Sequence, residues 1–256
     1  QAGSQNSDKR RSWDAKYKNN ALKSELDEAI SGEVPNEIAS ILNNHKEALS
    51  REKPKIATRQ ASGAVLELLT DIMPGLIGGS ADLTGSVNTK TSNATPVTSD
   101  NFQGSYIHYG VREFGMACVM NGLALHGGIV PFGGTFLVFA DYLRGALRLS
   151  ALMGLKVIYV LTHDSIGLGE DGPTHQPVET LASLRAIPNL NVLRPADSIE
   201  TAECWKIAIE SAGTPSAIVL TRQGLTTVRT EHSDENLSAK GGYVLAEAAG
   251  ERDVTI

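Results

Sequence analysis

Short apolar runs alternate with helical apolar periods along the chain from about residue 55 to residue 224. The runs predict five strands, at residues 75–83, 128–134, 156–162, 189–194 and 216–222. Helical spacing before and between them predicts helices at residues 61–72, 112–127, 137–154, 178–187 and 198–211. Continuous apolar strands that alternate with helices are typical of a parallel sheet covered on both faces. The pattern therefore predicts a doubly wound α/β fold.

More polar segments flank this region on both sides. Before it, residues 19–32 and 35–50 predict two amphipathic helices, and Pro35 is suited to the first turn of the second. After it the chain turns polar, and residues 241–256 resemble the first strand of a further domain. We therefore expect three parts: a helical N-terminal linker at 1–54, an α/β domain at 55–224, and a linker with the start of another domain at 225–256.

Two segments inside the predicted domain carry local signals. Residues 84–104 are rich in Thr, Ser and Asn and nearly free of large apolar side chains, so we expect a long surface loop there. Asp197 precedes a predicted helix and Glu200 lies three residues further on, which is the spacing of a capping box.

Composition and charge narrow the class of protein. A hydrophobic fraction of 41% and a charged fraction of 20% are ordinary for a globular protein, and the net charge of −6 argues against a general nucleic-acid binder. Cys118 and Cys204 lie in apolar helical patterns, which favours small core side chains over a disulfide or a metal site. No run is long and apolar enough to span a bilayer, and the N-terminus lacks a signal-peptide core, so we expect a reducing, cytoplasmic compartment.

The segment HDSIGLGEDGPTHQP, residues 163–177, holds the densest candidate chemistry. It follows a predicted strand, and open α/β sheets bind ligands at the carboxyl ends of their strands. Its glycines allow a backbone to approach a ligand closely. Because the ionisable groups share one loop without helical spacing, recognition of hydroxyl or phosphate groups is favoured over a metal site, and over mere solvation. The candidates are His163, Asp164, Glu170, Asp171 and His175.

Two further patterns have a structural and a functional interpretation. Glu113 lies near the start of a predicted helix, where the helix dipole favours its negative charge whether or not it binds a ligand. Phe136, Phe139 and Tyr142 recur every three residues, a spacing that is more often core than ligand contact. The preceding pair Gly133–Gly134 favours the functional interpretation, because it suggests a close approach of the backbone.

Arg59, Ser86 and Arg222 lie at or near the ends of predicted elements. Each alone is an ordinary surface residue. If they converge on one crevice, they form a clamp that can bind a phosphate through paired hydrogen bonds.

Several of these motifs occur together in one known family. In chain order they are GGSADLT, YGVREFGM, PFGGTF, LRLSALMG, THDSIGLGEDGPTHQP, RPAD and TRQ. Over residues 55–224 the chain resembles the central, pyrimidine-binding domain of transketolase. The flanking segments are similar to the linker before that domain and to the entry into the third domain.

The resemblance implies a transferase that moves a two-carbon ketol unit from a ketose phosphate to an aldose phosphate, as in the pentose phosphate pathway and the Calvin cycle. It implies thiamine diphosphate and Mg²⁺ as cofactors. Glu113 matches the glutamate that bonds the aminopyrimidine ring and promotes the loss of the thiazolium proton. The other implied cofactor contacts are an aromatic pocket and an aspartate near the thiazolium, which correspond to Phe136, Phe139, Tyr142 and Asp82.

The family's substrate site also has counterparts here. The phosphate site matches Arg59, Ser86, His163 and Arg222. Asp171 matches the group that binds a substrate hydroxyl, and His175 matches the one close to the reacting carbons. Glu113, His163 and His175 are thus the implied catalytic residues.

The chain departs from the family in one important respect. The diphosphate and metal site of the family uses a Gly-Asp-Gly motif followed by paired asparagines, and the GEDG at residues 169–172 is not that motif. We therefore assign no metal ligand in this chain and expect the Mg²⁺ ligands on a missing domain. A smaller departure is Phe114, where many relatives carry histidine.

We therefore expect half of an active site, completed by a homodimer partner or by a separate subunit, with sugar phosphates as substrates. The isolated chain is expected to have little or no turnover. The alternatives are a dihydroxyacetone synthase-like transferase and a non-catalytic half of a split, two-subunit enzyme. A deoxyxylulose phosphate synthase is disfavoured, because its relatives lack this form of the 163–177 loop.

Overall fold

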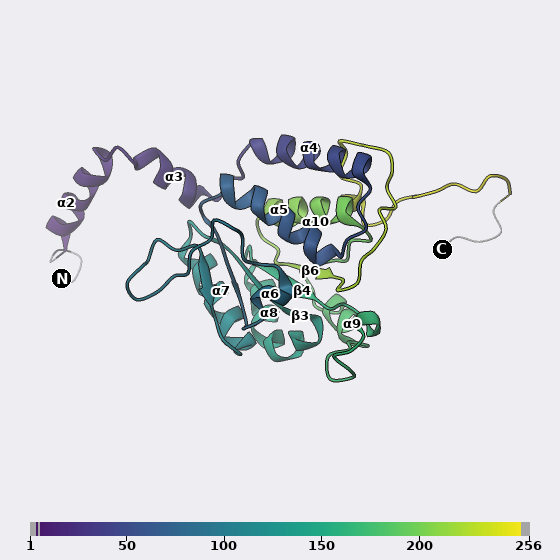
Figure 1. Cartoon of the computed structure of the whole chain (residues 1–256). Helices are drawn as coiled ribbons and strands as arrows, with labels where there is room; N and C mark the ends of the chain where they lie inside the picture. The colour runs from purple at the N-terminus through teal and green to yellow at the C-terminus, as the bar shows by residue number, and fades with distance from the viewer. Residues whose placement is uncertain (1–3, 5, 252–256) are drawn as a thin grey trace.

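A six-stranded, all-parallel sheet forms the centre of the molecule in a computed structural model that describes residue 4 and residues 6–251 (Figure 1). The strand order is β2-β1-β3-β4-β6-β5. The strands are β1 (Leu76–Ser80), β2 (Tyr106–His108), β3 (Val130–Phe136), β4 (Ile158–Thr162), β5 (Asn191–Leu193) and β6 (Ser216–Leu220). All five predicted strands are present.

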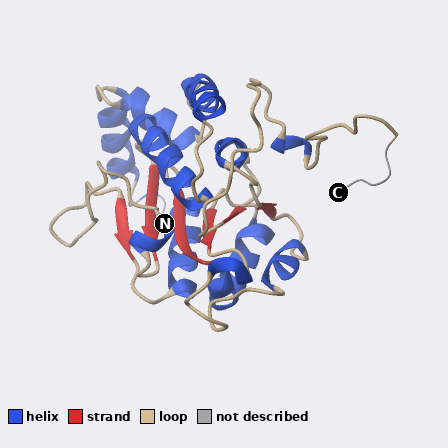
Figure 2. Ribbon diagram, turned by 45° about the vertical axis from the view of Figure 1, so that its right-hand side comes forward, coloured by secondary structure: helices blue, strands red, loops and turns tan. Residues whose placement is uncertain are grey.

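Helices cover both faces of this sheet (Figure 2). Strands β4 and β6 are buried along their whole length, which explains why they are apolar without a polar alternation. One face carries α4 (Glu37–Glu52), α5 (Thr58–Ile72) and α10 (Ser198–Glu210), and the other carries α7 (Glu113–His126), α8 (Ala140–Met153) and α9 (Thr180–Arg185). The prediction of a doubly wound α/β fold is confirmed.

The largest fully buried side chain, Trp205, shows how one face is packed. Its ring meets Phe132 of β3 edge to face, with the ring centroids 6.0 Å apart. Its indole nitrogen donates a hydrogen bond of 2.8 Å to Ser62 of α5, so the polar edge of the ring is satisfied inside the core.

The edge strand β2 and the segment before it differ from the predictions. Strand β2 has only three residues and was not predicted, because such a short run between glycines has no measurable periodicity. The expected surface loop at 84–104 begins with a short helix, α6 (Thr84–Val87), and it is not entirely on the surface. Val87 is fully buried, and Thr89 is buried with its hydroxyl 3.0 Å from the hydroxyl of Tyr106.

Other local predictions have mixed outcomes. Asp197 caps α10, because its carboxylate accepts a hydrogen bond of 2.9 Å from the amide of Glu200. Pro35 lies outside α4, since Asn36 is the N-cap residue and the helix begins at Glu37. Cys204 is buried as predicted, but Cys118 is exposed on the outer face of α7, so its interpretation as a core residue was wrong.

The N-terminal helices α2 (Ser7–Lys18) and α3 (Lys23–Ser31) extend away from the layered domain (Figure 1). Helix α3 lies inside the predicted helix at 19–32, whereas α2 was not predicted. Neither helix buries a residue. Among the helices of the described residues, none has the length and apolar character needed to cross a bilayer.

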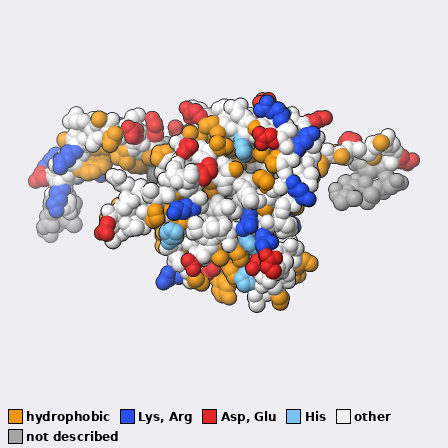
Figure 3. Space-filling view, in the orientation of Figure 1, with side chains coloured by type: hydrophobic (Ala, Val, Ile, Leu, Met, Phe, Trp, Pro, Cys, Tyr) orange, Lys and Arg blue, Asp and Glu red, His pale blue; other side chains and the backbone are white. Residues whose placement is uncertain are grey.

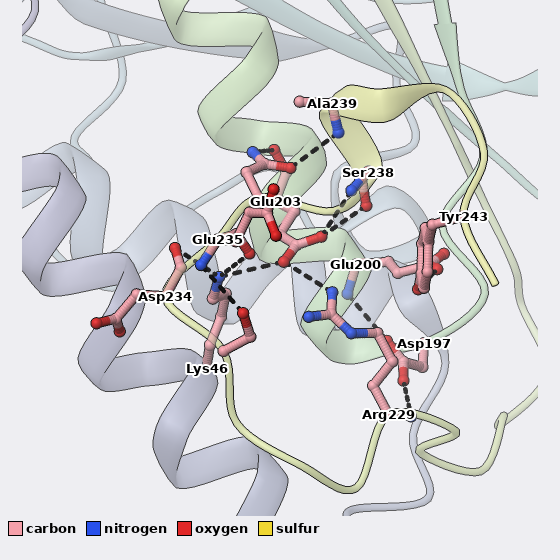
Figure 4. Close-up of polar contacts among 12 residues, drawn as sticks. Lys46, Asp197, Glu200, Glu203, Arg229, Asp234, Glu235, Ser238, Ala239 and Tyr243 are labelled. Atoms are coloured by element: carbon pink, nitrogen blue, oxygen red, sulfur yellow. Dashed lines mark hydrogen bonds and ion pairs between the residues drawn. The ribbon is translucent and has the colours of Figure 1, made fainter. Parts of the chain in front are cut away.

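The segment after β6 is held to the domain by a buried ion cluster (Figure 4). Glu203 of α10, only 1% exposed, lies 3.1 Å from the ammonium of Lys46 on α4 and 2.7 Å from the guanidinium of Arg229. It also accepts hydrogen bonds from the amide and hydroxyl of Ser238, in the short helix η3 (Ser238–Lys240). Burial opposes ionisation of Glu203, but the bonds from Arg229 and Ser238 outweigh it and lower the pKa of this carboxyl.

This cluster sets the path of the chain from residue 228 to residue 243. Asp197, besides capping α10, accepts hydrogen bonds from the amides of Val228 and Arg229. Tyr243 donates a hydrogen bond to Glu200 (Figure 4). Residues 241–251 contain no strand, so the predicted strand at 241–256 is absent from its described part, and residues 252–256 lie outside the described residues.

Candidate functional site

The carboxyl edge of the sheet has a topological switch point between β1 and β3. From β1 the chain continues to β2 on one side, whereas from β3 it continues to β4 on the other. Such a divergence opens a crevice at the carboxyl ends of the strands. Asp82 follows β1, Phe136 ends β3, His163 follows β4 and Arg222 follows β6. The topology therefore places these four predicted site residues along one edge.

The three predicted aromatic residues lie across the turn that leads from β3 into α8. Phe136 ends β3, Phe139 ends the short helix η1 (Leu137–Phe139), and Tyr142 lies in the first turn of α8. The rings of Phe136 and Phe139 are almost parallel, with centroids 5.7 Å apart and planes inclined by 9°. The Tyr142 ring is 6.0 Å from Phe139 and 68% exposed. The result is an open aromatic platform at the edge of the sheet.

Both histidines of the 163–177 loop join this platform. The His163 ring stacks on Phe136 at a centroid distance of 3.7 Å. The His175 ring meets Phe136 and Phe139 edge to face, at 5.8 and 5.2 Å. The loop turns at Gly169 and Gly172, which have φ angles of +94° and +77°. These two turns bring the ends of the loop together.

Gly133 and Gly134 have a structural role that differs from the expected one. A Cβ atom on Gly133 would lie 2.5 Å from the sulfur of Met120. A Cβ atom on Gly134 would lie 2.7 Å from the side chains of Val87 and Thr89. The backbone of β3 is therefore approached closely, but by core side chains of α7 and of the α6 segment.

His163 has an unusual backbone conformation and a lowered side-chain pKa. Its backbone is left-handed, with φ at +59°, and its side chain is almost fully buried. Nδ1 lies 2.8 Å from the hydroxyl of Thr162. Burial and the positive charge of Arg59 lower the pKa of His163 to about 4, although Asp171 opposes this shift. The imidazole is therefore neutral near pH 7.

Arg59 and Arg222 converge beside His163. Burial and the like charge of Arg222 lower the pKa of Arg59, and Asp171 opposes the shift. Nη1 of Arg59 donates to the carbonyl oxygen of Ser86, but its buried Nε has no hydrogen-bond partner among the described residues. An unpaired buried donor in a positive site is favourable for an anion.

Figure 3 shows histidine, basic and acidic side chains gathered on the lower part of the molecule, near the position of α9 in Figure 1.

The three acidic residues of the 163–177 loop have distinct environments. Glu170 is exposed and pairs with Arg222. Asp171 is exposed at the turn and acts electrostatically on both Arg59 and His163. Asp164 is buried and forms a paired contact with Arg194 at 2.8 and 2.9 Å, which anchors the loop. Sequence reasoning did not identify Arg194, because it lies 30 residues away.

Three predicted residues are less closely tied to this cluster. Ser86 contributes its carbonyl oxygen to Arg59, and no contact of its hydroxyl group is seen within the described residues. Asp82 is exposed, with a left-handed φ of +64°. Glu113 is the first residue of α7 and is 8% exposed, and no described residue forms a hydrogen bond or ion pair with its carboxylate. Because α7 begins at Glu113 shortly after the carboxyl end of β2, Glu113 lies at the same edge of the sheet as the aromatic platform.

Two cavities, of about 480 and 700 Å³, lie at the opposite edge of the sheet. Both are lined by Pro74, Gly75 and Gly128, which precede β1 and β3. No predicted site residue lines either one. Within residues 4 and 6–251, no three His, Cys, Asp or Glu side chains are grouped so that they could hold a metal ion.

The family match and the similar proteins all indicate the same family. The family described as "Transketolase, pyrimidine binding domain" matches residues 54–227. The transketolase of Sinorhizobium medicae is 57% identical over 247 residues, which are 96% of this chain and 36% of that protein. The transketolase of Bacillus subtilis is 49% identical over 250 residues, which are 95% of this chain and 37% of that protein. The chain thus spans a little over a third of the length of these relatives.

Solved structures share the fold. A transketolase from Pichia stipitis in complex with sedoheptulose-7-phosphate gives a TM-score of 0.84 at 40% identity, over 96% of this chain and 37% of that one. A split-gene transketolase, described as an inactive β4 tetramer, gives 0.55 at 33% identity, over 68% of this chain and 54% of that one. With the family match covering most of its length, the chain belongs to the transketolase family and contains the pyrimidine-binding domain of that family.

Proposed function

We propose that this chain supplies the pyrimidine half of a thiamine diphosphate site and the sugar-phosphate clamp of a transketolase. Residues 55–224 form the working domain, the segment 1–54 is a helical linker whose helix α4 packs on that domain, and residues 225–256 act as a linker. The observation that carries the proposal is the convergence of five side chains with the aromatic platform at one edge of the sheet. They are Arg59, His163, Asp171, His175 and Arg222.

The residues present fit the pyrimidine end of the cofactor. The nearly parallel Phe136 and Phe139 rings, with exposed Tyr142 beside them, offer a surface for a flat heteroaromatic ring. When bound, thiamine diphosphate supplies an acidic thiazolium carbon that becomes the nucleophile. Glu113 would hydrogen-bond the ring nitrogen of the aminopyrimidine, because its carboxyl group is shielded from water and has no other described partner. Asp82 lies on the thiazolium side.

The clamp binds the phosphate end of the sugar. Arg59 and Arg222 provide planar donors for phosphate oxygens, and neutral His163 adds a neighbouring donor or acceptor. Ser86 fixes the direction of Arg59 through its carbonyl oxygen. Asp171, at the turn of the loop, binds a substrate hydroxyl, and His175 lies close to the reacting carbons. The substrates are therefore ketose and aldose phosphates.

The rest of the site comes from outside this segment. We place the diphosphate and Mg²⁺ ligands on another part of the enzyme, since the family's Gly-Asp-Gly motif does not occur in this segment. The outer faces of α7 and α8 expose large apolar side chains along both helices, as expected of a subunit interface. They are Phe114, Leu125, Tyr142, Leu149 and Leu152. The contact is with a homodimer partner or with a separate subunit, in a reducing, cytoplasmic compartment.

The isolated chain should show little or no ketol transfer. The reason is that half of the cofactor site, including its metal ligands, lies elsewhere. A coupled assay of the purified 256-residue chain with thiamine diphosphate, Mg²⁺, a ketose phosphate and an aldose phosphate measures this. Full activity of the chain alone would contradict the half-site proposal.

Replacing Arg59 with alanine in a complete enzyme that carries this segment should lower kcat/KM for phosphorylated substrates roughly 10- to 100-fold, the usual range for a lost charged hydrogen bond. Acceptors without a phosphate should be unaffected. The matched control is Arg51→Ala, which removes an exposed guanidinium from the end of α4. Equal losses for phosphorylated and non-phosphorylated acceptors would remove Arg59 from the clamp.

A further inference from the structure

Two buried threonines join the first turn of α5 to the end of β6. The amide of Thr58 donates to the hydroxyl oxygen of Thr221 at 3.0 Å, and the amide of Thr221 donates to the hydroxyl oxygen of Thr58 at 2.7 Å. The two hydroxyl oxygens are 3.2 Å apart. We call this reciprocal contact between Thr58 and Thr221 the threonine clasp. It connects segments that are 163 residues apart in the sequence.

Both hydroxyl groups of the clasp have their hydrogen bonds satisfied. The hydroxyl of Thr221 donates to the carbonyl oxygen of Gln223 at 3.0 Å, so its one proton is already used. The proton between the two hydroxyls must therefore come from Thr58. Each hydroxyl then donates once and also accepts an amide. Both residues are buried, so these bonds do not compete with water.

The clasp also caps α5. The residue at the N-cap position is Ala57, whose side chain cannot accept a hydrogen bond. The free amides of the first turn are instead satisfied by Thr221, through its hydroxyl to Thr58 and through its carbonyl oxygen to Arg59 at 3.4 Å. The cap of this helix thus belongs to the strand that carries the other half of the clamp.

Each threonine is followed directly by an arginine of the clamp, Arg59 or Arg222. The like charges of the two arginines repel one another, and this repulsion adds to the effect of burial in lowering the pKa of Arg59. This repulsion favours their separation, and Arg222 pairs with the exposed Glu170. The clasp prevents the two backbones from separating, so the guanidinium groups stay within reach of the same anion.

We propose that Thr58 and Thr221 are positioning residues that preorganise the two arginines for a phosphate group. The inference rests on the proposed function, because it assigns the anion to that same clamp. Preorganisation raises affinity by removing the cost of ordering the site when the ligand binds. The threonines do not touch the ligand, and they act through the arginines that follow them.

The test measures binding of inorganic phosphate and of fructose 6-phosphate to the isotope-labelled 256-residue chain, followed through the Nε–H signals of its arginines by NMR. Thr221→Val keeps the shape of the side chain but removes both the acceptor for α5 and the donor to Gln223. It should raise the Kd for both ligands on the order of tenfold. Thr221→Ser restores the hydroxyl and should return the Kd to within about twofold of wild type.

Thr70→Val is the matched control. It removes a half-buried hydroxyl near the other end of α5. That hydroxyl donates a hydrogen bond to the carbonyl oxygen of Leu66 in the same helix. It should leave the Kd unchanged, and its unfolding temperature shows how much a lost threonine hydroxyl affects stability alone. If Thr221→Val does not fold, Thr58→Ala and Thr58→Ser replace it, because alanine removes only the acceptor for the Thr221 amide and the shared proton.

The outcomes distinguish the inference about the threonine clasp from the proposed phosphate clamp. If wild type binds phosphate and Thr221→Val binds equally well, the clasp is only structural and the inference is overturned, while the clamp remains. If Thr221→Ser is as weak as Thr221→Val, the hydroxyl is not the cause and the inference is also overturned. If wild type binds neither ligand, the clamp of the proposed function fails as well.

Discussion

Glu113→Gln, in a complete enzyme that carries this segment, should lower kcat by about 10²- to 10⁴-fold, the range typical of a lost acid–base group. The amide has the same shape as the carboxyl but cannot hold a negative charge or exchange a proton with the aminopyrimidine ring. The carboxylate is almost completely shielded from solvent and lies at the helix N-terminus, where its charge is favoured. Because no described side chain pairs with it, the substitution removes no bond from the fold.

The measurement that isolates this role is exchange of the thiazolium proton, followed by NMR in deuterated buffer with cofactor bound. Exchange should slow in parallel with kcat, whereas the circular dichroism spectrum should not change. Glu47→Gln, on the exposed side of α4, is the control and should leave both rates unaltered. Normal exchange in the Glu113→Gln enzyme would exclude the assigned role.

Glu203→Ala should lower the free energy of unfolding by about 3–5 kcal/mol, far more than the loss of a surface charge. The substitution leaves the buried charges of Lys46 and Arg229 without their counter-ion. It also removes the acceptor that holds Ser238. Urea unfolding followed by circular dichroism measures the change, and proteolysis should cut the segment between residues 229 and 243 faster than in wild type.

A control on the same helix distinguishes the buried cluster from surface charge. Glu210 pairs with Lys206 at the exposed end of α10, so Glu210→Ala should cost less than about 1 kcal/mol. The effect of Glu203 should depend on pH, because its folded-state pKa is lowered. Its stabilisation is complete above the ordinary value of 4.5 and is lost as the pH falls through the folded-state pKa, so wild type and Glu203→Ala should converge in acid. A constant difference between them across this range would contradict the ionic origin.

Most of the fold could be predicted because its buried strands are continuous apolar runs between helical segments. The runs that became β4 and β6 have this form. Strand β2 could not be predicted, because three residues carry no period, and its pairing with β1 depends on tertiary contacts. Val87 was missed for a similar reason, since a single apolar residue in a polar stretch does not reveal that it packs against Gly134.

The residue types that meet at the candidate site could be picked out from the sequence, but their geometry could not. The residue types and glycines of the 163–177 loop indicated hydroxyl or phosphate recognition. The meeting of Arg59 with Arg222 depends on the strand order, which no local pattern encodes. The threonine clasp had one faint signal, the repeated pair Thr-Arg at 58–59 and 221–222, which becomes meaningful only when β6 lies beside the start of α5.

The left-handed backbone at His163 and Asp82 bears on how such a protein changes over evolution. A side chain in that conformation costs on the order of 1–2 kcal/mol. Glycine avoids this cost and loses only about 0.5–1 kcal/mol more in chain entropy. Selection for stability alone would therefore favour glycine at the exposed Asp82, whereas glycine at His163 would also lose the packing of the buried ring on Phe136. A relative in which this edge of the sheet has lost its function should therefore lose the Asp82 carboxylate first and keep the packed His163 ring for longer.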